Sequence, residues 1–225
     1  MIVVAIDNSI TSPGIMRCEL DENLNIVEVK FLTFSSTKKF QSKTNMGEVI
    51  TYSNSDYKGK QFNKIMDIHN HVISFIGDNY CDYMVCEDYA YSGKGDITGL
   101  AESMGLLKSH FYNMGSKIRL YSIPSIKKFY TGKGTADKVL VEEYFDLDDN
   151  PFKPDLSFLP KVYESNTAPT DNLVDSWAIL TMLLAELKLR QGVIQFKDLT
   201  DKQREVFLQA DNKQPNYPAR DFIKK

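Results

Sequence analysis

Cysteine and histidine are both scarce in this 225-residue chain, with three of each. The cysteines include no Cys-x-x-Cys pair, so they predict reduced, buried thiols and exclude a disulfide framework or a zinc-thiolate site. The histidines are too few and too scattered to form a zinc cluster. No apolar run approaches the roughly 20 residues that span a bilayer, and no basic segment followed by an apolar one predicts a secretory signal. We therefore expect a cytoplasmic protein with no membrane partner.

Charge is nearly balanced overall, with a formal net charge of -3, but it is unevenly distributed. A strongly basic stretch contains Lys117, Arg119, Lys127, Lys128, Lys133 and Lys138. An acidic stretch follows and contains Glu142, Glu143, Asp146, Asp148, Asp149 and Asp155. The overall charge argues mildly against nucleic acid as a partner, whereas the distribution favours one locally basic face. Two solvated helix faces of opposite sign explain the same pattern, and both interpretations remain open.

Apolar runs and their periodicity predict an α/β protein. Strands are expected over residues 2–7, 14–20, 24–34, 82–87 and 118–122. Helices are expected over residues 61–78, 98–114, 124–130, a segment ending near 145, 172–190 and 201–209. Residues 35–60 are polar and lack clear periodicity, so they are interpreted as a loop or flap inserted in the fold. Residues 150–169 contain several prolines and are predicted to form an irregular connection.

The order of these elements predicts a mixed five-stranded sheet with helices on both faces. Three antiparallel strands come first, and helices and strands then alternate, which is the order used by ribonuclease H-like folds. We expect one domain over residues 1–190 and a C-terminal tail with a short helix over residues 191–225. Fold alone does not fix function, which depends on particular side chains.

Four acidic residues lie at the ends of the buried elements. Asp7 ends the first strand and Glu87 ends the fourth, while Asp171 and Asp175 open the long helix near the C-terminus. The first and fourth strands are neighbours in the expected sheet, so Asp7 and Glu87 would lie side by side. Asp171 and Asp175 are four residues apart, hence on one helix face. Carboxylates at the edge of a core are costly unless a charge compensates them, and a divalent cation does so directly.

These acids suit phosphodiester hydrolysis by two metal ions. Such a reaction needs an activated water, in-line geometry and a stabilised leaving alkoxide, which two cations about 3.5–4 Å apart supply. Taken singly, Asp7 is explained as a turn residue, Glu87 as a surface residue and Asp171 as a helix cap. Asp175 is harder to explain that way because its neighbours on the helix are mostly apolar. Together, the four favour a metal site.

Several motifs, in order along the chain, resemble the RuvC-like Holliday junction resolvases. The matching segments are Ile6-Asp7-Asn8-Ser9, Val85-Cys86-Glu87-Asp88-Tyr89, the small-residue helix 99–105, Pro124-Ser125-Ile126-Lys127-Lys128, and Asp175-Ser176-Trp177-Ala178-Ile179. The most specific match is Thr131-Gly132-Lys133-Gly134-Thr135-Ala136-Asp137-Lys138, which fits the family pattern Thr-Gly-x-Gly-x-Ala-x-Lys. The resemblance covers about residues 1–190. It leaves the insertion 35–60 and the tail unaccounted for.

The resemblance implies roles for individual residues. The metal ligands, for two Mg²⁺ ions that Mn²⁺ can replace, would be Asp7, Glu87, Asp171 and Asp175. The family spaces its last two ligands three residues apart, which here selects Asn172 as the alternative to Asp171. Lys138 would neutralise the scissile phosphate, and the remaining DNA-binding residues would be Lys127, Lys128, Lys133, Gly132, Gly134, Tyr89, Tyr91 and Lys94. The helix containing residues 99–105 would form a homodimer interface.

The expected function is a metal-dependent endonuclease that resolves four-way DNA junctions by paired nicks. The longer, acidic segment 150–169 suggests a divergent member, encoded by a bacteriophage and acting in the cytoplasm of a bacterial or phage-infected cell. A broader nuclease for branched DNA, flaps or RNA–DNA hybrids is the alternative within the same fold. A non-catalytic junction-binding protein and an actin-like or sugar-kinase-like phosphotransferase are alternatives of other classes. The last lacks support because it needs a second glycine-rich phosphate loop and an adenosine pocket near the C-terminus, and the sequence shows neither.

Overall fold

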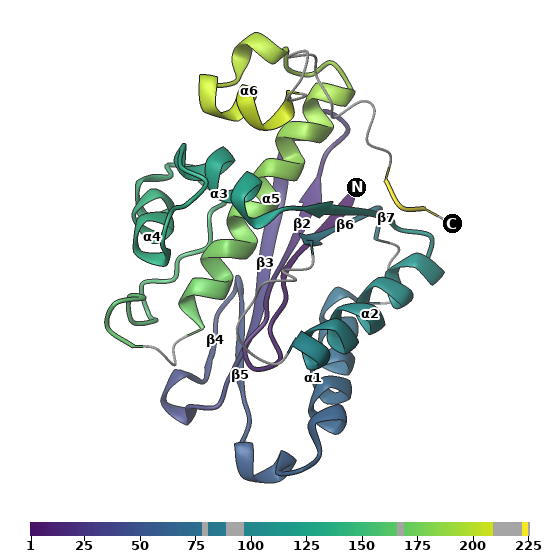
Figure 1. Ribbon diagram of the computed structural model, residues 1–225, viewed down its shortest axis with the longest axis vertical. Coiled ribbons are helices and arrows are strands. Elements are labelled where there is room, and N and C mark those ends of the chain that lie inside the picture. Colours follow the sequence, from purple (N-terminus) through teal and green to yellow (C-terminus); the bar gives the residue numbers. More distant parts are fainter. Residues whose placement is uncertain (78–80, 89–96, 166–168, 209–221, 225) are drawn as a thin grey trace.

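Strand β1 (Ile2–Asp7) lies inside the sheet because its side chains from Val3 to Ile6 are fully buried. It pairs antiparallel with β2 (Gly14–Leu20) and parallel with β6 (Tyr83–Glu87). The computed structural model describes residues 1–77, 81–88, 97–165, 169–208 and 222–224 (Figure 1). Within them one seven-stranded sheet has the order β4-β5-β3-β2-β1-β6-β7. The other strands are β3 (Ile26–Ser35), β4 (Ser42–Lys43), β5 (Gly47–Thr51) and β7 (Lys117–Tyr121).

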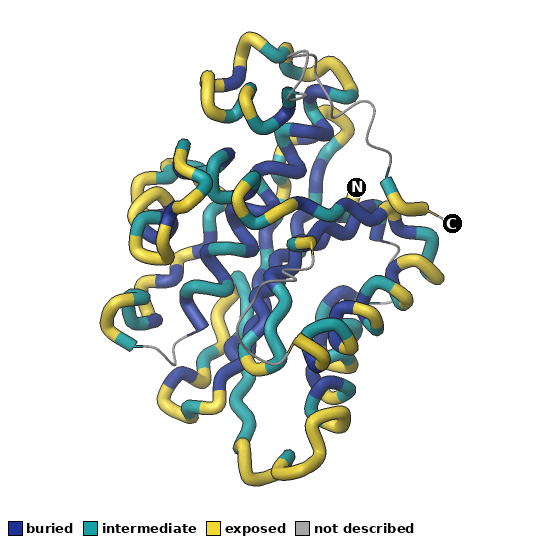
Figure 2. Tube along the Cα trace, viewed as in Figure 1, coloured by how far each residue is buried: buried dark blue, intermediate teal, exposed yellow. Residues whose placement is uncertain are grey.

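Helices cover both faces of this sheet (Figure 1). They are α1 (Gln61–Ile76), α2 (Ile97–Asn113), α3 (Ile123–Thr131), α4 (Lys138–Leu147), α5 (Thr170–Arg190) and α6 (Asp201–Phe207). Successive side chains of a strand point to opposite faces, so the side chains of β1 contribute to two hydrophobic cores, one on each face of the sheet. Val3 and Ala5 pack in the core beneath α3 to α6, whereas Val4 and Ile6 pack in the core beneath α1 and α2. Figure 2 shows the strands at the centre as the most buried part of the chain.

The expected α/β class and ribonuclease H-like order are confirmed, but the sheet has seven strands and not five. The two additional strands, β4 and β5, come from the segment 35–60, which the sequence predicted to be a loop or flap. β5 pairs parallel with β3, and β4 pairs antiparallel with β5. Only Val49 of β5 is buried. A strand with a single buried side chain lacks the alternation that identifies strands in a sequence.

Glycine at position 14 allows helix α5 to lie directly on the sheet. A Cβ atom added at Gly14 would lie 2.0 Å from the carbonyl oxygen of Asn172 and 2.9 Å from the amide nitrogen of Leu173. Both are backbone atoms, so a larger side chain would displace the first turn of α5. The first turn of α5 is thus held against the end of β1, because Gly14 is paired with Asp7 in the sheet.

We expect Gly14→Ala to lower the free energy of unfolding by about 1–3 kcal/mol, the usual cost of overpacking. Gly105→Ala is the matched control, since a Cβ there would meet no atom within 4 Å and the position lies inside helix α2. That control should leave stability unchanged or raise it by up to about 1 kcal/mol. Urea denaturation of both variants measures the difference, and equal midpoints would contradict the close approach.

A charged cluster is buried between β7 and the second half of α5. Glu186, which is 1% exposed, accepts hydrogen bonds from Arg119, from Nε of Arg190 at 2.8 Å and from the hydroxyl of Tyr121 at 2.5 Å. Burial, followed by the charge of Glu186, raises the pKa of Tyr121 well above its usual range. Arg119 was counted in the basic stretch of the sequence, but it is 5% exposed and does not contribute to a basic surface.

Residues that follow α6 return to the edge of the sheet. Ile223 pairs antiparallel with Ile118 of β7 through two backbone hydrogen bonds. The ring of Phe222 packs at 5.1 Å from that of Tyr83, and the guanidinium groups of Arg119 and Arg190 lie over it. The tail is therefore tied to the core at this point. No helix in the described ranges is long and apolar enough to cross a membrane.

Candidate metal centre

Asp7 and Glu87 occupy equivalent positions at the ends of neighbouring parallel strands. Ile6 of β1 is in register with Cys86 of β6, so the next residue on each strand is the acid. Adjacent strands lie about 4.8 Å apart, which places the two side chains beside each other at the carboxyl edge of the sheet. Asp7 is buried and Glu87 is half-buried. The sequence-based expectation that these strands are neighbours is confirmed.

Asp171 and Asp175 reach the same edge from helix α5. The first turn of this helix lies against Gly14, which is paired with Asp7 across β1 and β2. Both acids are half-buried, and Asp171 lies in the first turn, where the helix dipole favours a negative charge. Three elements that are far apart in the sequence thus bring four carboxylates to one region.

The carboxylates repel one another, and this repulsion raises their pKa values. Burial raises the pKa of Asp7 well above its usual range, and the charges of Glu87, Asp175 and Asp171 raise it further. Burial and then the charge of Asp175 raise the pKa of Glu87 to about 7. Burial and then the charge of Asp171 raise the pKa of Asp175 to about 6. This region holds more negative charge than its surroundings compensate, which is the electrostatic condition that a bound cation relieves.

Two lysines border the acids. Lys138, at the start of α4, forms an ion pair with Asp171, and its charge also lowers the pKa of Asp7 and Asp175. Burial alone would lower the pKa of Lys138, but the hydrogen bond and charge of Asp171 raise it overall. Lys127 donates a hydrogen bond to the carbonyl oxygen of Ala136 at 2.6 Å, and its charge lowers the pKa of Glu87 and Asp175.

The donor chemistry of this region fits a hard divalent cation, since all four acids offer carboxylate oxygens. Their side chains do not form a finished coordination group, however. Among the residues that the structure describes, no three histidine, cysteine, aspartate or glutamate side chains lie close enough together to hold a metal ion. Lys138 occupies the carboxylate of Asp171. Metal binding therefore requires side-chain movement.

The raised pKa values predict how stability depends on pH in the absence of metal. Between the unfolded pKa of about 4 and the folded values of about 7 for Glu87 and about 6 for Asp175, the folded protein binds more protons than the unfolded protein. Stability contributed by these groups must then fall as pH rises through that window. In EDTA, we expect the melting temperature to decrease from pH 5 to pH 7.5.

The double variant Glu87→Gln/Asp175→Asn is the control for this prediction, because it removes the two titrating groups. Its melting temperature should decrease less between the same two pH values than that of the unmodified protein. Adding Mg²⁺ at pH 7.5 should raise the melting temperature of the unmodified protein only. Parallel pH profiles for the two proteins would contradict the assignment of the pKa shifts to this site.

The glycine loop between α3 and α4 has a structural role of its own. Gly132 ends α3 in the left-handed conformation, with φ of 78°, and its amide donates to the carbonyl oxygen of Lys128. A Cβ on Gly134 would lie 3.1 Å from the carbonyl oxygen of Pro124. Lys128, which was predicted to contact phosphate, instead forms an ion pair within the chain, with Glu205 of α6 at 2.7 Å. Lys133 is exposed.

Asn172 holds the turn that follows β1. Its side-chain amide donates to the backbone oxygen of Ser12 at 2.5 Å and to the hydroxyl of Ser12 at 2.7 Å. Asn172 is thus fixed through its amide nitrogen, whereas Asp171 is paired with Lys138. Asn8 links the same turn to α2, since it donates to the carbonyl oxygen of Leu100 and accepts from the hydroxyl of Ser103. Predicted DNA contacts at Tyr89, Tyr91 and Lys94 lie outside the described residues.

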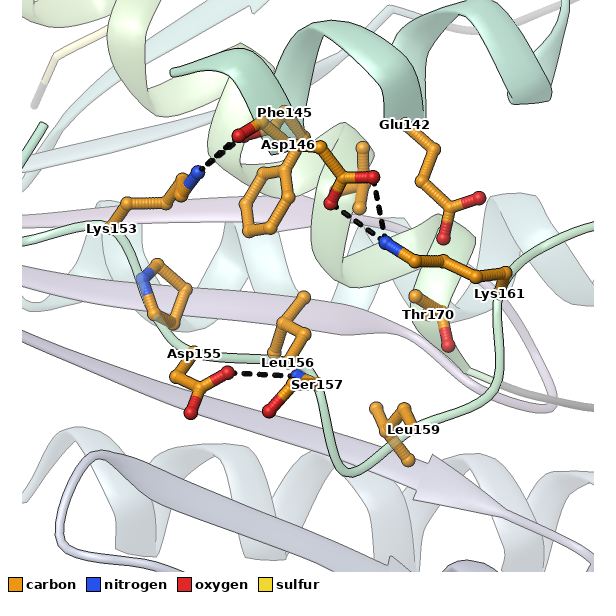
Figure 3. Close-up of a pocket in the computed structure, with 12 residues that line it drawn as sticks. Glu142, Phe145, Asp146, Lys153, Asp155, Leu156, Ser157, Leu159, Lys161 and Thr170 are labelled. Carbon is orange, nitrogen blue, oxygen red and sulfur yellow. Dashed lines mark hydrogen bonds and ion pairs between the residues drawn. The ribbon is translucent and has the colours of Figure 1, made fainter. Parts of the chain in front are cut away.

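A separate cavity of about 230 Å³ lies between α4, the segment 153–161 and the start of α5 (Figure 3). An ion pair between Lys161 and Asp146, at 2.7 Å, lies at its wall, and Glu142 accepts a hydrogen bond from the amide of Val162. None of the four acids of the candidate metal centre lines this cavity. Its lining mixes apolar and paired charged groups, so it does not extend the metal centre.

No protein-family model and no curated protein sequence matches the chain. Among solved structures, that of Thermus thermophilus RuvC matches with a TM-score of 0.52 and 17% identity, covering 86% of this chain and 98% of that one. The fold is that of RuvC. T. thermophilus RuvC in complex with Holliday junction substrate matches at a TM-score of 0.47 and 15% identity, covering 86% and 97% of the two chains.

Some contributors to the site were not apparent from the sequence. Lys127 was expected to grip the DNA backbone, but its charge acts directly on Glu87 and Asp175. The ion pair of Lys138 with Asp171 was likewise not expected. A lysine within a glycine loop gives no signal of which acid it faces, because the two residues are 33 positions apart. The packing of α4 on α5 brings them together.

Proposed function

We propose that this protein is a metal-dependent endonuclease that cleaves branched DNA, with four-way junctions as its preferred substrate. The observation that supports this most is the meeting of Asp7, Glu87, Asp171 and Asp175 at one edge of a sheet with the RuvC fold. Their mutual effect on pKa indicates a region short of positive charge. The nuclease domain is assigned to residues 1–190, with residues 191–225 as an appended tail.

The four carboxylates would hold Mg²⁺, or Mn²⁺ in its place, as two ions per site. When bound, such ions activate a water molecule and stabilise the charge that develops on the leaving oxygen. The carboxylates themselves orient the site, because they are fixed on two strands and one helix of the core. Burial of Asp7 excludes bulk water from one side of the site, which strengthens every charge interaction there.

The lysines complete the proposed site. If Asp171 turned to a bound metal ion, the ammonium group of Lys138 would be free to meet a phosphate oxygen, since the Lys138 side chain is 60% exposed at the start of α4. Lys127 remains fixed by the carbonyl of Ala136 and balances part of the negative charge of Glu87 and Asp175. Lys133 reaches solvent from the glycine loop and would contact the DNA backbone.

A homodimer would present two such sites to a junction with twofold symmetry. Helix α2 offers a suitable face, because a Cβ on Gly105 would meet no atom within 4 Å and Ile97 is 45% exposed. Small and apolar side chains on an exposed helix face permit close packing of a second copy. Asn8 would connect this helix to the strand that carries Asp7, through its bonds to Leu100 and Ser103.

The proposed function is tested with a set of synthetic substrates in one assay. A four-way junction, a flap, a replication fork, an RNA–DNA hybrid and a linear duplex are incubated with the protein and Mg²⁺, and nicks are mapped on both strands. We expect symmetrical paired nicks on the junction at the highest rate. Equal or faster cleavage of flaps or hybrids would assign the broader nuclease activity instead.

A second candidate function is favoured by one observation. Because no finished metal-binding group is present among the described residues and Lys138 pairs with Asp171, the protein would also suit a role as a junction-binding protein without catalysis. The two functions separate cleanly in a chelator experiment. Junction binding that survives EDTA, with no product at any Mg²⁺ or Mn²⁺ concentration, would select the non-catalytic role.

A further inference from the structure

The segment 36–64, which comprises most of the insertion 35–60 and the first turn of α1, has a charge opposite to that of the rest of the protein. Residues 36–64 contain six lysines and two acids, whereas the remaining residues contain 21 basic and 28 acidic residues. The lysines are Lys38, Lys39, Lys43, Lys58, Lys60 and Lys64. An excess of four positive charges in 29 residues of an acidic protein indicates a local function for the charge.

Four of these lysines are exposed and have no carboxylate partner among the described residues. Lys38, Lys39, Lys58 and Lys60 are exposed, and the only ion pair in the insertion joins Lys43 to Glu48. Lys64 is half-buried over the ring of Tyr52. We name Lys38, Lys39, Lys58 and Lys60 the edge lysines. Their charge is available to a ligand, because nothing in the described chain neutralises it.

The topology of the sheet places the edge lysines on the same side of the molecule as the four acids. Strands β5, β3, β1 and β6 all run in the same direction, since β3 and β1 are each antiparallel to β2 and β5 is parallel to β3. The segments after β3 and β5, which carry the edge lysines, therefore leave the sheet at the edge where Asp7 and Glu87 lie. Figure 1 shows both segments at the lower end of the molecule, and Figure 2 shows them largely exposed.

The insertion is also fastened to the turn that follows Asp7. The hydroxyl of Tyr52 donates to the carbonyl oxygen of Thr11 at 2.8 Å, and the hydroxyl of Tyr57 donates to Asp67 of α1 at 2.8 Å. β5 lies three strand spacings from β1 in the sheet order, which is roughly 15 Å at about 4.8 Å per strand. The segments that carry the edge lysines are thus held at a fixed place in the sheet relative to the strand that carries Asp7.

We propose that the edge lysines bind the phosphate backbone of a duplex arm whose end is held at the metal centre. This inference rests on the proposed function, because that function places DNA at the acids. Duplex DNA carries one negative charge per about 1.7 Å of its axis, so an arm running along the carboxyl edge passes both the acids and the edge lysines. These contacts position the substrate without reading its sequence.

The test measures binding of a synthetic four-way junction with long arms, in EDTA so that no strand is cut. In the variant Lys38→Glu/Lys39→Glu/Lys58→Glu/Lys60→Glu, we expect the Kd at moderate salt to rise by roughly tenfold or more. The slope of log Kd against log salt should fall by up to about 3.6, since each lost phosphate contact removes about 0.9. Single-turnover cleavage at saturating DNA should be unchanged, because the edge lysines lie away from the acids.

Charge reversal at two lysines away from the carboxyl ends of the strands provides the control. Lys117 begins β7 and Lys197 precedes α6, and both are exposed, so Lys117→Glu/Lys197→Glu should keep the unmodified affinity and salt slope. A second variant, with glutamine at the four edge positions, guards against misfolding. Shortening the arms to a few base pairs should lower the affinity of the unmodified protein to that of the edge-lysine variants.

Two outcomes would overturn the inference. One is an unchanged Kd and salt slope in both edge-lysine variants. The other is a loss of affinity of the same size in the control variant Lys117→Glu/Lys197→Glu. Failure of the proposed function is recognised separately, as absence of cleavage by the unmodified protein on every substrate, and the binding measurements in EDTA still decide the role of the edge lysines.

Discussion

Asp7→Asn is expected to lower the rate of junction cleavage by about a thousandfold or more, with little change in junction binding measured in EDTA. Asp7 is the most buried of the four acids and lies beside Glu87 at the sheet edge. An amide at this position cannot supply the negative charge that a divalent cation requires, although it preserves the shape of the side chain. Cleavage of a labelled junction under single-turnover conditions measures the effect.

The same substitution should make the metal-free protein more stable. Burial and the neighbouring carboxylates raise the pKa of Asp7 well above its usual range, so its ionised form is unfavourable near pH 7.5 in the absence of metal. Removing that charge should raise the free energy of unfolding in EDTA by about 1–3 kcal/mol. Loss of activity together with a gain in stability separates a functional carboxylate from a structural one.

Asp149→Asn is the matched control for Asp7→Asn, because Asp149 is an exposed acid beyond the end of α4. It should retain full activity and unchanged stability. If Asp7→Asn cleaved junctions at the rate of the unmodified protein, the carboxylates at the sheet edge would not form the catalytic site. If it lost activity and stability together, Asp7 would have to be regarded as part of the scaffold.

Glu186→Gln is expected to lower the free energy of unfolding by about 3–5 kcal/mol, the usual cost of removing one member of a buried ion pair. Glu186 is 1% exposed and accepts from Arg119, Arg190 and Tyr121. Without the carboxylate, the guanidinium groups of Arg119 and Arg190 would face each other without a negative charge between them. The melting temperature should fall by an amount on the order of 10 °C.

The exposed ion pair of Asp146 with Lys161 is the control for Glu186. Both side chains of that pair are partly exposed, at 50% and 38%, so Asp146→Asn should cost no more than about 1 kcal/mol. Thermal unfolding of both variants under one set of conditions gives the comparison. Similar melting temperatures for Glu186→Gln and Asp146→Asn would mean that the cluster beneath β7 contributes little to folding.

The sequence predicted the central elements closely because their signals are local. The continuous apolar run of β1 and the helical spacing of α1 and α5 are legible without any knowledge of distant residues. For the same reason, Asp7 and Glu87 were predicted as strand ends, and the expected order of strands made them neighbours. Their role in metal binding is the proposal that Asp7→Asn tests.

Other features escaped prediction because they depend on residues far apart in the chain. Arg119 and Glu186 are separated by 67 positions, and nothing around Arg119 distinguishes it from the neighbouring surface lysines. β5 is recognisable only through its pairing with β3, because only one of its side chains is buried and the sequence therefore shows no alternation of apolar and polar residues. Lys128 was predicted to contact DNA, and its ion pair with Glu205 arises from the packing of α6 on α3.

The pairing of Ile223 with Ile118 has a practical consequence for handling the protein. β7 is the last strand of the sheet, and an uncovered terminal strand invites hydrogen bonding by a strand from another molecule. Truncation after residue 208 would remove this cover along with the ring of Phe222. Preparations shortened in that way should self-associate as their concentration increases, and versions that keep residues 222–224 are the better choice for crystallisation.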